Sequence, residues 1–132
     1  MNKEFCTYEQ ALALKELGFD EPCFLGYKME DLFELFTKGL VYNSIYETFN
    51  ETTNLSCTAP LYQQAFRWFR EKHELVVDWN HSQYDNAGSY IGVSIKNIHL
   101  EETVVGVYKS YEEAEQACLD KLIQIVKNNA HI

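Results

Sequence analysis

Two segments decide the fold, Thr58-Ala-Pro-Leu-Tyr-Gln-Gln-Ala-Phe-Arg-Trp-Phe-Arg-Glu-Lys-His73 and Ser110-Tyr-Glu-Glu-Ala-Glu-Gln-Ala-Cys-Leu119. In the first, the apolar and aromatic side chains fall on one arc of a helix, with Thr58 as its expected cap and Pro60 in its first turn. In the second, Ser110 and Glu113 have the spacing of a capping box, and a wide apolar arc follows. Both segments are therefore predicted to be helices that bury one face in the core.

Three segments between these helices have the pattern of strands, namely Leu75–Trp79, Ser89–Ile95 and Thr103–Tyr108. In the second strand, apolar residues alternate with Tyr90 and Ser94, which are expected on the outward face. The chain from Asn80 to Gly88 is rich in turn-forming residues and is predicted to be a loop. The order helix, three strands, helix predicts an antiparallel three-stranded sheet backed by two helices.

The residues before Thr58 predict an N-terminal helix and a β-hairpin. Thr7 can cap the helix, and Gly18 can adopt the left-handed conformation that ends it. Cys23–Lys28 has the composition of a strand. Its partner, Asp31–Thr37, fits either the second strand of a hairpin or a short helical turn, and both interpretations stay open.

We therefore predict a single α+β domain over residues 1–132, with the N-terminal helix and hairpin in 1–57 and the αβββα core in 58–132. A further short strand is expected at Leu40–Tyr46, and Asn50–Ser56 is expected to be a loop.

The chain is acidic, with 132 residues and a formal net charge of −9. Binding to nucleic acid depends on Lys and Arg that neutralise phosphates, so an acidic chain without a basic stripe is a poor candidate for it. The acidity fits either solubility or a surface directed at a basic partner. The start of the chain has no apolar signal segment and no stretch reaches membrane-spanning length, so we expect a cytoplasmic protein.

Four cysteines, Cys6, Cys23, Cys57 and Cys118, are widely scattered and lack the paired spacing of a metal site. We expect them to pack as small apolar residues, and we expect no metal and no cofactor. Cys57 precedes a predicted helix start, where the helix dipole favours a thiolate. No histidine stands in a motif that would activate this thiol, so a structural role is the preferred interpretation.

Gln63, Arg67 and Arg70 share the polar side of the helix after Thr58, and with Tyr90 they are the predicted ligand- or partner-binding residues. Arginine forks match phosphate and carboxylate geometry, and tyrosine can stack on a base, so a nucleotide-like ligand is one candidate. The competing interpretation is a solvated helix face on which Arg67 pairs with Glu71 one turn later.

Asp78, His81 and Asp85 surround the predicted loop between the first two strands of the sheet. These residue types can bind a divalent metal or exchange protons, but a polar loop gives such a triplet by chance. The sequence has no glycine-rich phosphate loop and no nucleophile or zinc-protease motif. We therefore predict that the protein is not an enzyme.

The last helix begins with the acidic residues Glu112, Glu113 and Glu115, which are predicted to form an acidic surface. Carboxylates spaced like phosphates can imitate DNA. The competing interpretation is that the positive end of the helix dipole stabilises these side chains.

Three resemblances bear on these residues. Glu112-Glu-Ala-Glu-Gln-Ala117 resembles the start of the last helix of the double-stranded RNA-binding domain, although glutamates replace that family's lysines and so argue against RNA binding. Gly88-Ser-Tyr-Ile-Gly-Val-Ser-Ile95 followed by Tyr111-Glu-Glu-Ala114 resembles the partial version of this fold in HicB antitoxins, without their proline-rich segment. Glu9–Cys23, Ala59–Lys72 and Tyr111–Ile123 resemble a family of small proteins of bacteriophages and prophages of gut bacteria.

The third resemblance implies a phage setting and no particular activity. With the acidity and the missing catalytic motifs, it favours a non-enzymatic accessory protein that binds a host protein, for example in counter-defence. The alternatives are a protein that sequesters a nucleotide-like signal and a HicB-like antitoxin module. The sequence leaves homo-oligomerisation open.

Overall fold

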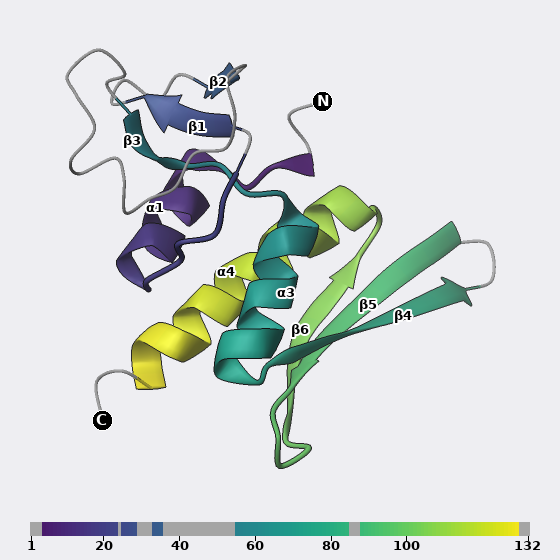
Figure 1. The fold of residues 1–132 in the computed structure, drawn as a ribbon. Coiled ribbons are helices and arrows are strands. Elements are labelled where there is room, and N and C mark those ends of the chain that lie inside the picture. The colour runs from purple at the N-terminus through teal and green to yellow at the C-terminus, as the bar shows by residue number, and fades with distance from the viewer. Residues whose placement is uncertain (1–3, 24, 29–32, 36–54, 85–87, 130–132) are drawn as a thin grey trace. The chain divides into compact units, whose positions relative to one another are not determined.

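The computed structural model describes residues 4–23, 25–28, 33–35, 55–84 and 88–129 (Figure 1). The chain divides into two compact units, Met1–Leu61 and Tyr62–Ile132. The sequence predicts the boundary between the two segments after Cys57, four residues before Leu61. That the two segments form a single domain stays a prediction, and the strand expected at Leu40–Tyr46 lies outside the described residues.

The first unit contains one helix and a small antiparallel sheet. Its elements are α1 (Tyr8–Glu16), β1 (Leu25–Lys28), β2 (Phe33–Leu35) and β3 (Leu55–Thr58). The strand order is β2-β1-β3, and Leu25 lies opposite Leu35 in the pair of β1 and β2. The predicted N-terminal helix and hairpin are therefore confirmed, and Phe33–Leu35 forms a strand rather than a helical turn.

Both ends of α1 follow the signals in the sequence. The Thr7 hydroxyl accepts a hydrogen bond from the Gln10 backbone N–H (3.2 Å), and the Gln10 side chain accepts one from the Thr7 N–H (3.0 Å). Gly18 has a φ of 98°, and the Phe19 N–H donates to the Leu14 carbonyl oxygen (2.9 Å). These bonds satisfy backbone groups that the ends of a helix leave unpaired.

Tyr27 joins the sheet of the first unit to the chain that precedes α1. Its buried hydroxyl donates to the Cys6 carbonyl oxygen (2.6 Å), and its ring meets that of Tyr8 edge to face, with centroids 5.4 Å apart. A buried hydroxyl needs such a partner, because leaving it unpaired costs about 1–3 kcal/mol. The core around it consists of Ala11, Tyr27, Cys57 and Ala59, with Phe5, Tyr8 and Leu12 packed against it.

The second unit has the predicted αβββα order. Its elements are α3 (Tyr62–His73), β4 (Val76–Tyr84), β5 (Gly88–Lys96), β6 (Glu102–Tyr108) and α4 (Tyr111–Asn129). The sheet is antiparallel in the order β4-β5-β6, and α3 and α4 lie side by side on one of its faces (Figure 1). The α+β fold class is therefore confirmed. Within the described residues, no helix is both long and apolar enough to cross a membrane.

Side-chain alternation along β5 explains which face the helices cover. Ile91, Val93 and Ile95 are almost fully buried, whereas Tyr90 and Ser94 point to the other face and are partly exposed. The helices contribute Phe69, Leu119 and Leu122 to the same core, together with other apolar side chains of both helices. An antiparallel sheet often buries one face in this way and leaves the other to water.

The structure corrects three boundaries. Leu55 and Ser56, which were expected to lie in a loop, belong to β3. The first helix of the second unit begins at Tyr62, and Thr58 ends β3 instead of capping the helix. Proline disfavours helical geometry in the residue before it, so Ala59 resists a helix that starts ahead of Pro60. The predicted loop at Asn80–Gly88 is also wrong in part, because β4 continues to Tyr84 in regular pairing with β5. Main-chain hydrogen bonds of the hairpin hold these polar residues in the strand.

A bulge at Val105 interrupts the pairing of β6 with β5. Gly106 lies opposite Val93 and Val104 lies opposite Ser94. Val105, between them, therefore has no partner residue in β5. Gly106 has a φ of 153°, and the Tyr108 hydroxyl reaches back to donate to the Val105 carbonyl oxygen (3.4 Å). An extra residue in one strand shifts the side chains after it to the opposite faces.

Candidate functional site

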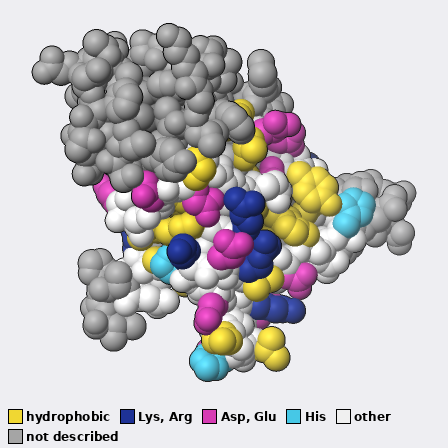
Figure 2. All heavy atoms as spheres, in the orientation of Figure 1, with side chains coloured by type: hydrophobic (Ala, Val, Ile, Leu, Met, Phe, Trp, Pro, Cys, Tyr) yellow, Lys and Arg dark blue, Asp and Glu magenta, His cyan; other side chains and the backbone are white. Residues whose placement is uncertain are grey.

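The polar face of α3 holds three of the predicted binding residues, Gln63, Arg67 and Arg70, all of them exposed. The Gln63 amide donates to a carboxylate oxygen of Glu115 on α4 (3.0 Å). Basic and acidic side chains interleave over α3 rather than forming a patch of one sign (Figure 2). Gln63 therefore links the two helices.

Tyr90, the fourth predicted binding residue, lies on the far side of the sheet from α3. It precedes the buried Ile91 in β5, so it points away from the helices. The sheet therefore separates Tyr90 from Arg67 and Arg70, and one ligand cannot touch all of them at once. A nucleotide-like ligand held by the arginines of α3 alone stays a prediction.

The structure does not bring Asp78 and His81 together. They stand three residues apart on the continuous strand β4, and side chains at odd spacing on a strand point to opposite faces. Asp78 forms an ion pair with Lys96 (3.3 Å). Asp85 lies outside the described residues.

The acidic residues at the start of α4 divide into two groups. Glu112 and Glu113 are exposed in the first turn, and the Glu113 backbone N–H donates to the Ser110 hydroxyl (3.2 Å), as the predicted cap requires. Glu115 is partly buried and bonds to Gln63. Their positions fit stabilisation by the helix dipole. Glu115 thus lies at a helix–helix contact, apart from the exposed pair.

The four cysteines are all buried, and none of them forms a disulfide. Cys57 lies in β3, five residues before α3 begins, and not at the helix start where the sequence had placed it. Burial, with a smaller contribution from the nearby Glu115 carboxylate, raises the pKa of the Cys118 thiol to about 12. Thiolate is the reactive form, so Cys118 is inert at neutral pH.

His73 ends α3 against two aromatic rings. Its imidazole lies 4.9 Å from the Trp68 ring and 5.7 Å from the Phe69 ring, measured between centroids. Burial lowers the pKa of His73 from its usual value of 6.5, because the charged imidazolium loses solvation there.

This shift predicts a loss of stability in acid. The unfolded chain takes up a proton at His73 below about pH 6.5, whereas the folded chain resists protonation, so the free energy of unfolding falls as the pH drops through this range. The fall ends once the pH is below the pKa of the folded state. Urea unfolding between pH 7.5 and pH 5, as an approximate range, measures it. His73→Phe should remove this contribution, and identical pH dependence in both proteins would contradict the assignment.

The uncovered face of the sheet carries an unexpected group of valines. Val76, Val104 and Val107 are 47%, 69% and 57% exposed. Val104 lies opposite Ser94 and Val107 opposite Gly92, so both project on the side away from the helices. We call this surface the open sheet face, and it consists of Val76, Asp78, Asn80, Tyr90, Gly92, Ser94, Lys96, Glu102, Val104 and Val107.

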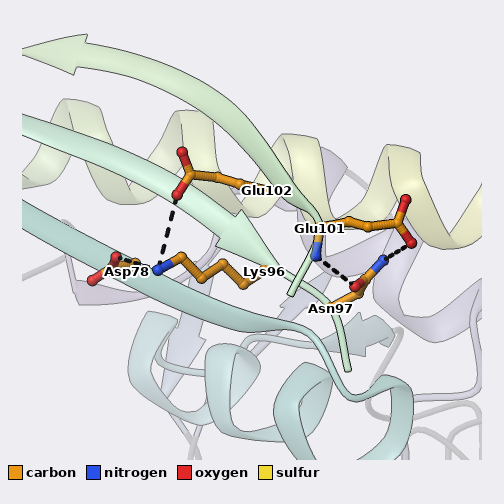
Figure 3. Close-up of polar contacts among 5 residues, drawn as sticks. All are labelled: Asp78, Lys96, Asn97, Glu101 and Glu102. Carbon is orange, nitrogen blue, oxygen red and sulfur yellow. Dashed lines mark hydrogen bonds and ion pairs between the residues drawn. The ribbon is translucent and has the colours of Figure 1, made fainter. Parts of the chain in front are cut away.

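Three charged side chains form a row at one end of the open sheet face (Figure 3). The Lys96 ammonium lies 3.3 Å from the Asp78 carboxylate and 3.9 Å from the Glu102 carboxylate. Such exposed pairs contribute about 0–1 kcal/mol to stability. One lysine between two carboxylates leaves this end of the face negative.

The exposed valines are not among the residues predicted from the sequence, although one signal for them was present. Thr103–Tyr108 places β-branched residues at neighbouring positions, so both sides of that strand must carry apolar side chains. A sheet with two covering helices buries only one of those sides. The bulge at Val105 decides which residues of β6 are exposed, and no local sequence pattern predicts that bulge.

The described residues contain no group of three or more His, Cys, Asp or Glu that is arranged to hold a metal ion. The arrangement that stands out is a partly apolar sheet face with a negative end. Such a surface can bind another macromolecule by contact alone. No protein-family model, no curated protein and no solved structure matches this chain.

Proposed function

We propose that this chain is a non-enzymatic binding protein that attaches to a partner protein through the open sheet face. The observation that carries the proposal is the exposure of Val104 and Val107 on neighbouring rows of β6. The outward face of a solvated sheet normally carries polar side chains. Contiguous exposed apolar groups with a polar rim are typical of protein-binding surfaces.

The partner we propose is a protein of a bacterial host cell. The sequence resembles small proteins of bacteriophages and prophages of gut bacteria, which makes an accessory role in the host cytoplasm, such as counter-defence, the fitting context. The net charge of −9 and the negative row at Asp78, Lys96 and Glu102 favour a partner with a basic contact surface.

The test compares capture by the wild type with capture by Val104→Thr/Val107→Thr. Threonine keeps the shape and the β-branching of valine, so the strand is preserved while the apolar contact is lost. A protein captured from lysates of gut bacteria is purified, and its affinity is measured by calorimetry. We expect the double variant to bind at least about tenfold more weakly.

Glu112→Gln on α4 serves as the control and should bind like the wild type. The proposal fails if the purified protein binds the double variant and the wild type equally, or if no captured protein binds saturably.

A further inference from the structure

The turn between β5 and β6 presents two exposed apolar side chains. Ile98 is 64% exposed and Leu100 is 80% exposed. Figure 2 shows hydrophobic and histidine side chains gathered at this turn, at the end of the sheet. Neither side chain contributes to the core, so folding alone does not explain why they are apolar.

The backbone of this turn is held by Asn97. The Asn97 side-chain oxygen accepts from the backbone N–H groups of His99 (2.9 Å) and Glu101 (3.1 Å), and its amide donates to the Glu101 carboxylate (3.2 Å), as Figure 3 shows for Glu101. The main chains of Asn97 and Glu101 also pair (3.1 Å). A fixed turn loses little conformational freedom when it binds.

Leu100 adopts a conformation that leucine rarely takes. Its φ is 61°, in the left-handed region where glycine and asparagine are favoured. No burial compensates for this strain, because the side chain is exposed. Strain of this kind at an exposed position points to a role outside the fold.

Carboxylates lie at the same end of the sheet as this apolar pair. Glu101 and Glu102 follow Leu100 directly in the chain, and Asp78 lies on the row of the sheet next to that of Glu102. Lys96 is the cation that pairs with Glu102 and Asp78. Three carboxylates against one ammonium leave the region negative (Figure 3). An anionic lipid surface would be repelled here, and a basic segment would be attracted.

We propose that this end of the sheet, which we call the turn site (Asp78, Ile98, Leu100, Glu101 and Glu102), binds a basic amphipathic segment of a partner protein. Ile98 and Leu100 contact the apolar side chains of that segment, and the carboxylates pair with its lysines and arginines. The inference rests on the proposed function and names the part of the partner that binds.

The probe is a phage-displayed library of random dodecapeptides, selected on the full-length chain. We expect the enriched peptides to combine Lys or Arg with large apolar residues, and to bind more weakly as salt rises. Fluorescence anisotropy then gives the affinity of a synthesised peptide for each variant.

Leu100→Gly should weaken binding about tenfold or more while leaving the Tm unchanged or raised, because glycine relieves the strain. This pairing separates a contact role from a structural one. Asparagine also tolerates the left-handed region, so Leu100→Asn should likewise weaken peptide binding and leave the Tm unchanged or raised.

The charge test uses two variants with the same change in net charge. Glu101→Gln/Glu102→Gln should weaken peptide binding, whereas Glu112→Gln/Glu113→Gln on α4 should not. Equal effects would show attraction by the overall charge and would overturn the turn site.

The remaining outcomes separate this inference from the proposed function. Peptides that lose affinity for Val104→Thr/Val107→Thr but bind Leu100→Gly normally would overturn the turn site and leave the open sheet face in place. Two results of the selection would also overturn the turn site: no peptide is enriched, or the enriched peptides are acidic. Binding to vesicles of phosphatidylcholine and phosphatidylglycerol would overturn it as well, if Leu100→Gly abolishes that binding.

Discussion

Replacing Phe69 with alanine should lower the free energy of unfolding by about 3–5 kcal/mol. Phe69 is fully buried in α3, and its ring packs against those of Trp68 and His73, with centroids 5.0 Å and 5.7 Å away. Truncation removes the burial of an aromatic ring and leaves a cavity that the surrounding helices and sheet only partly close. Urea unfolding followed by tryptophan fluorescence measures the loss, since Trp68 and Trp79 both lie in the second unit.

The matched control for this variant is Val107→Ala on the open sheet face. Val107 is more than half exposed, so its truncation should change the free energy of unfolding by no more than about 0.5 kcal/mol. A similar loss in both variants would mean that Val107 is packed and that the open sheet face is not open.

Gly106→Ala should destabilise the protein by about 1–3 kcal/mol or more, through two additive effects. Its φ of 153° is one that residues with a side chain rarely adopt. A Cβ atom at this position would also lie 2.8 Å from the Tyr108 hydroxyl oxygen and 3.1 Å from the ring carbon that bears it. Thermal unfolding gives the sum of the two effects.

Two further variants separate the effects at Gly106. Gly92→Ala on the neighbouring strand places its Cβ at 3.5 Å from the nearest atom, an ordinary contact, and should be far milder. Adding Tyr108→Phe to Gly106→Ala removes the closest contact and should recover part of the stability. Full recovery would mean that the backbone strain is absent, and no recovery would mean that the Tyr108 hydroxyl does not crowd this site.

Local chemistry made the helices and most strands predictable. The caps at Thr7 and Ser110 and the stop at Gly18 depend on residues within one turn, and the alternation in β5 depends on neighbours in the same strand. Such signals act over a few residues, so one sequence suffices to detect them. The start of α3 was missed although its signal, the proline after Ala59, is also local.

The candidate site was harder to predict because it depends on contacts between segments. The sheet that separates Tyr90 from Arg67 and the bond from Gln63 to Glu115 arise only when α3, α4 and β5 pack. The bulge at Val105 turns Val104 and Val107 to the same face, which simple alternation forbids for residues three apart. Leu100 contradicts the backbone preference of its own residue type, so propensity misleads there.

The burial of every cysteine has a consequence for handling the protein. Cys6, Cys23 and Cys57 belong to the first unit, Cys118 belongs to the second, and all four are shielded from solvent. The folded chain therefore offers oxidants and neighbouring molecules no accessible sulfur with which to cross-link. A thiol that reacts in a native sample identifies a molecule that has opened, and the position of the labelled cysteine tells which half has come apart.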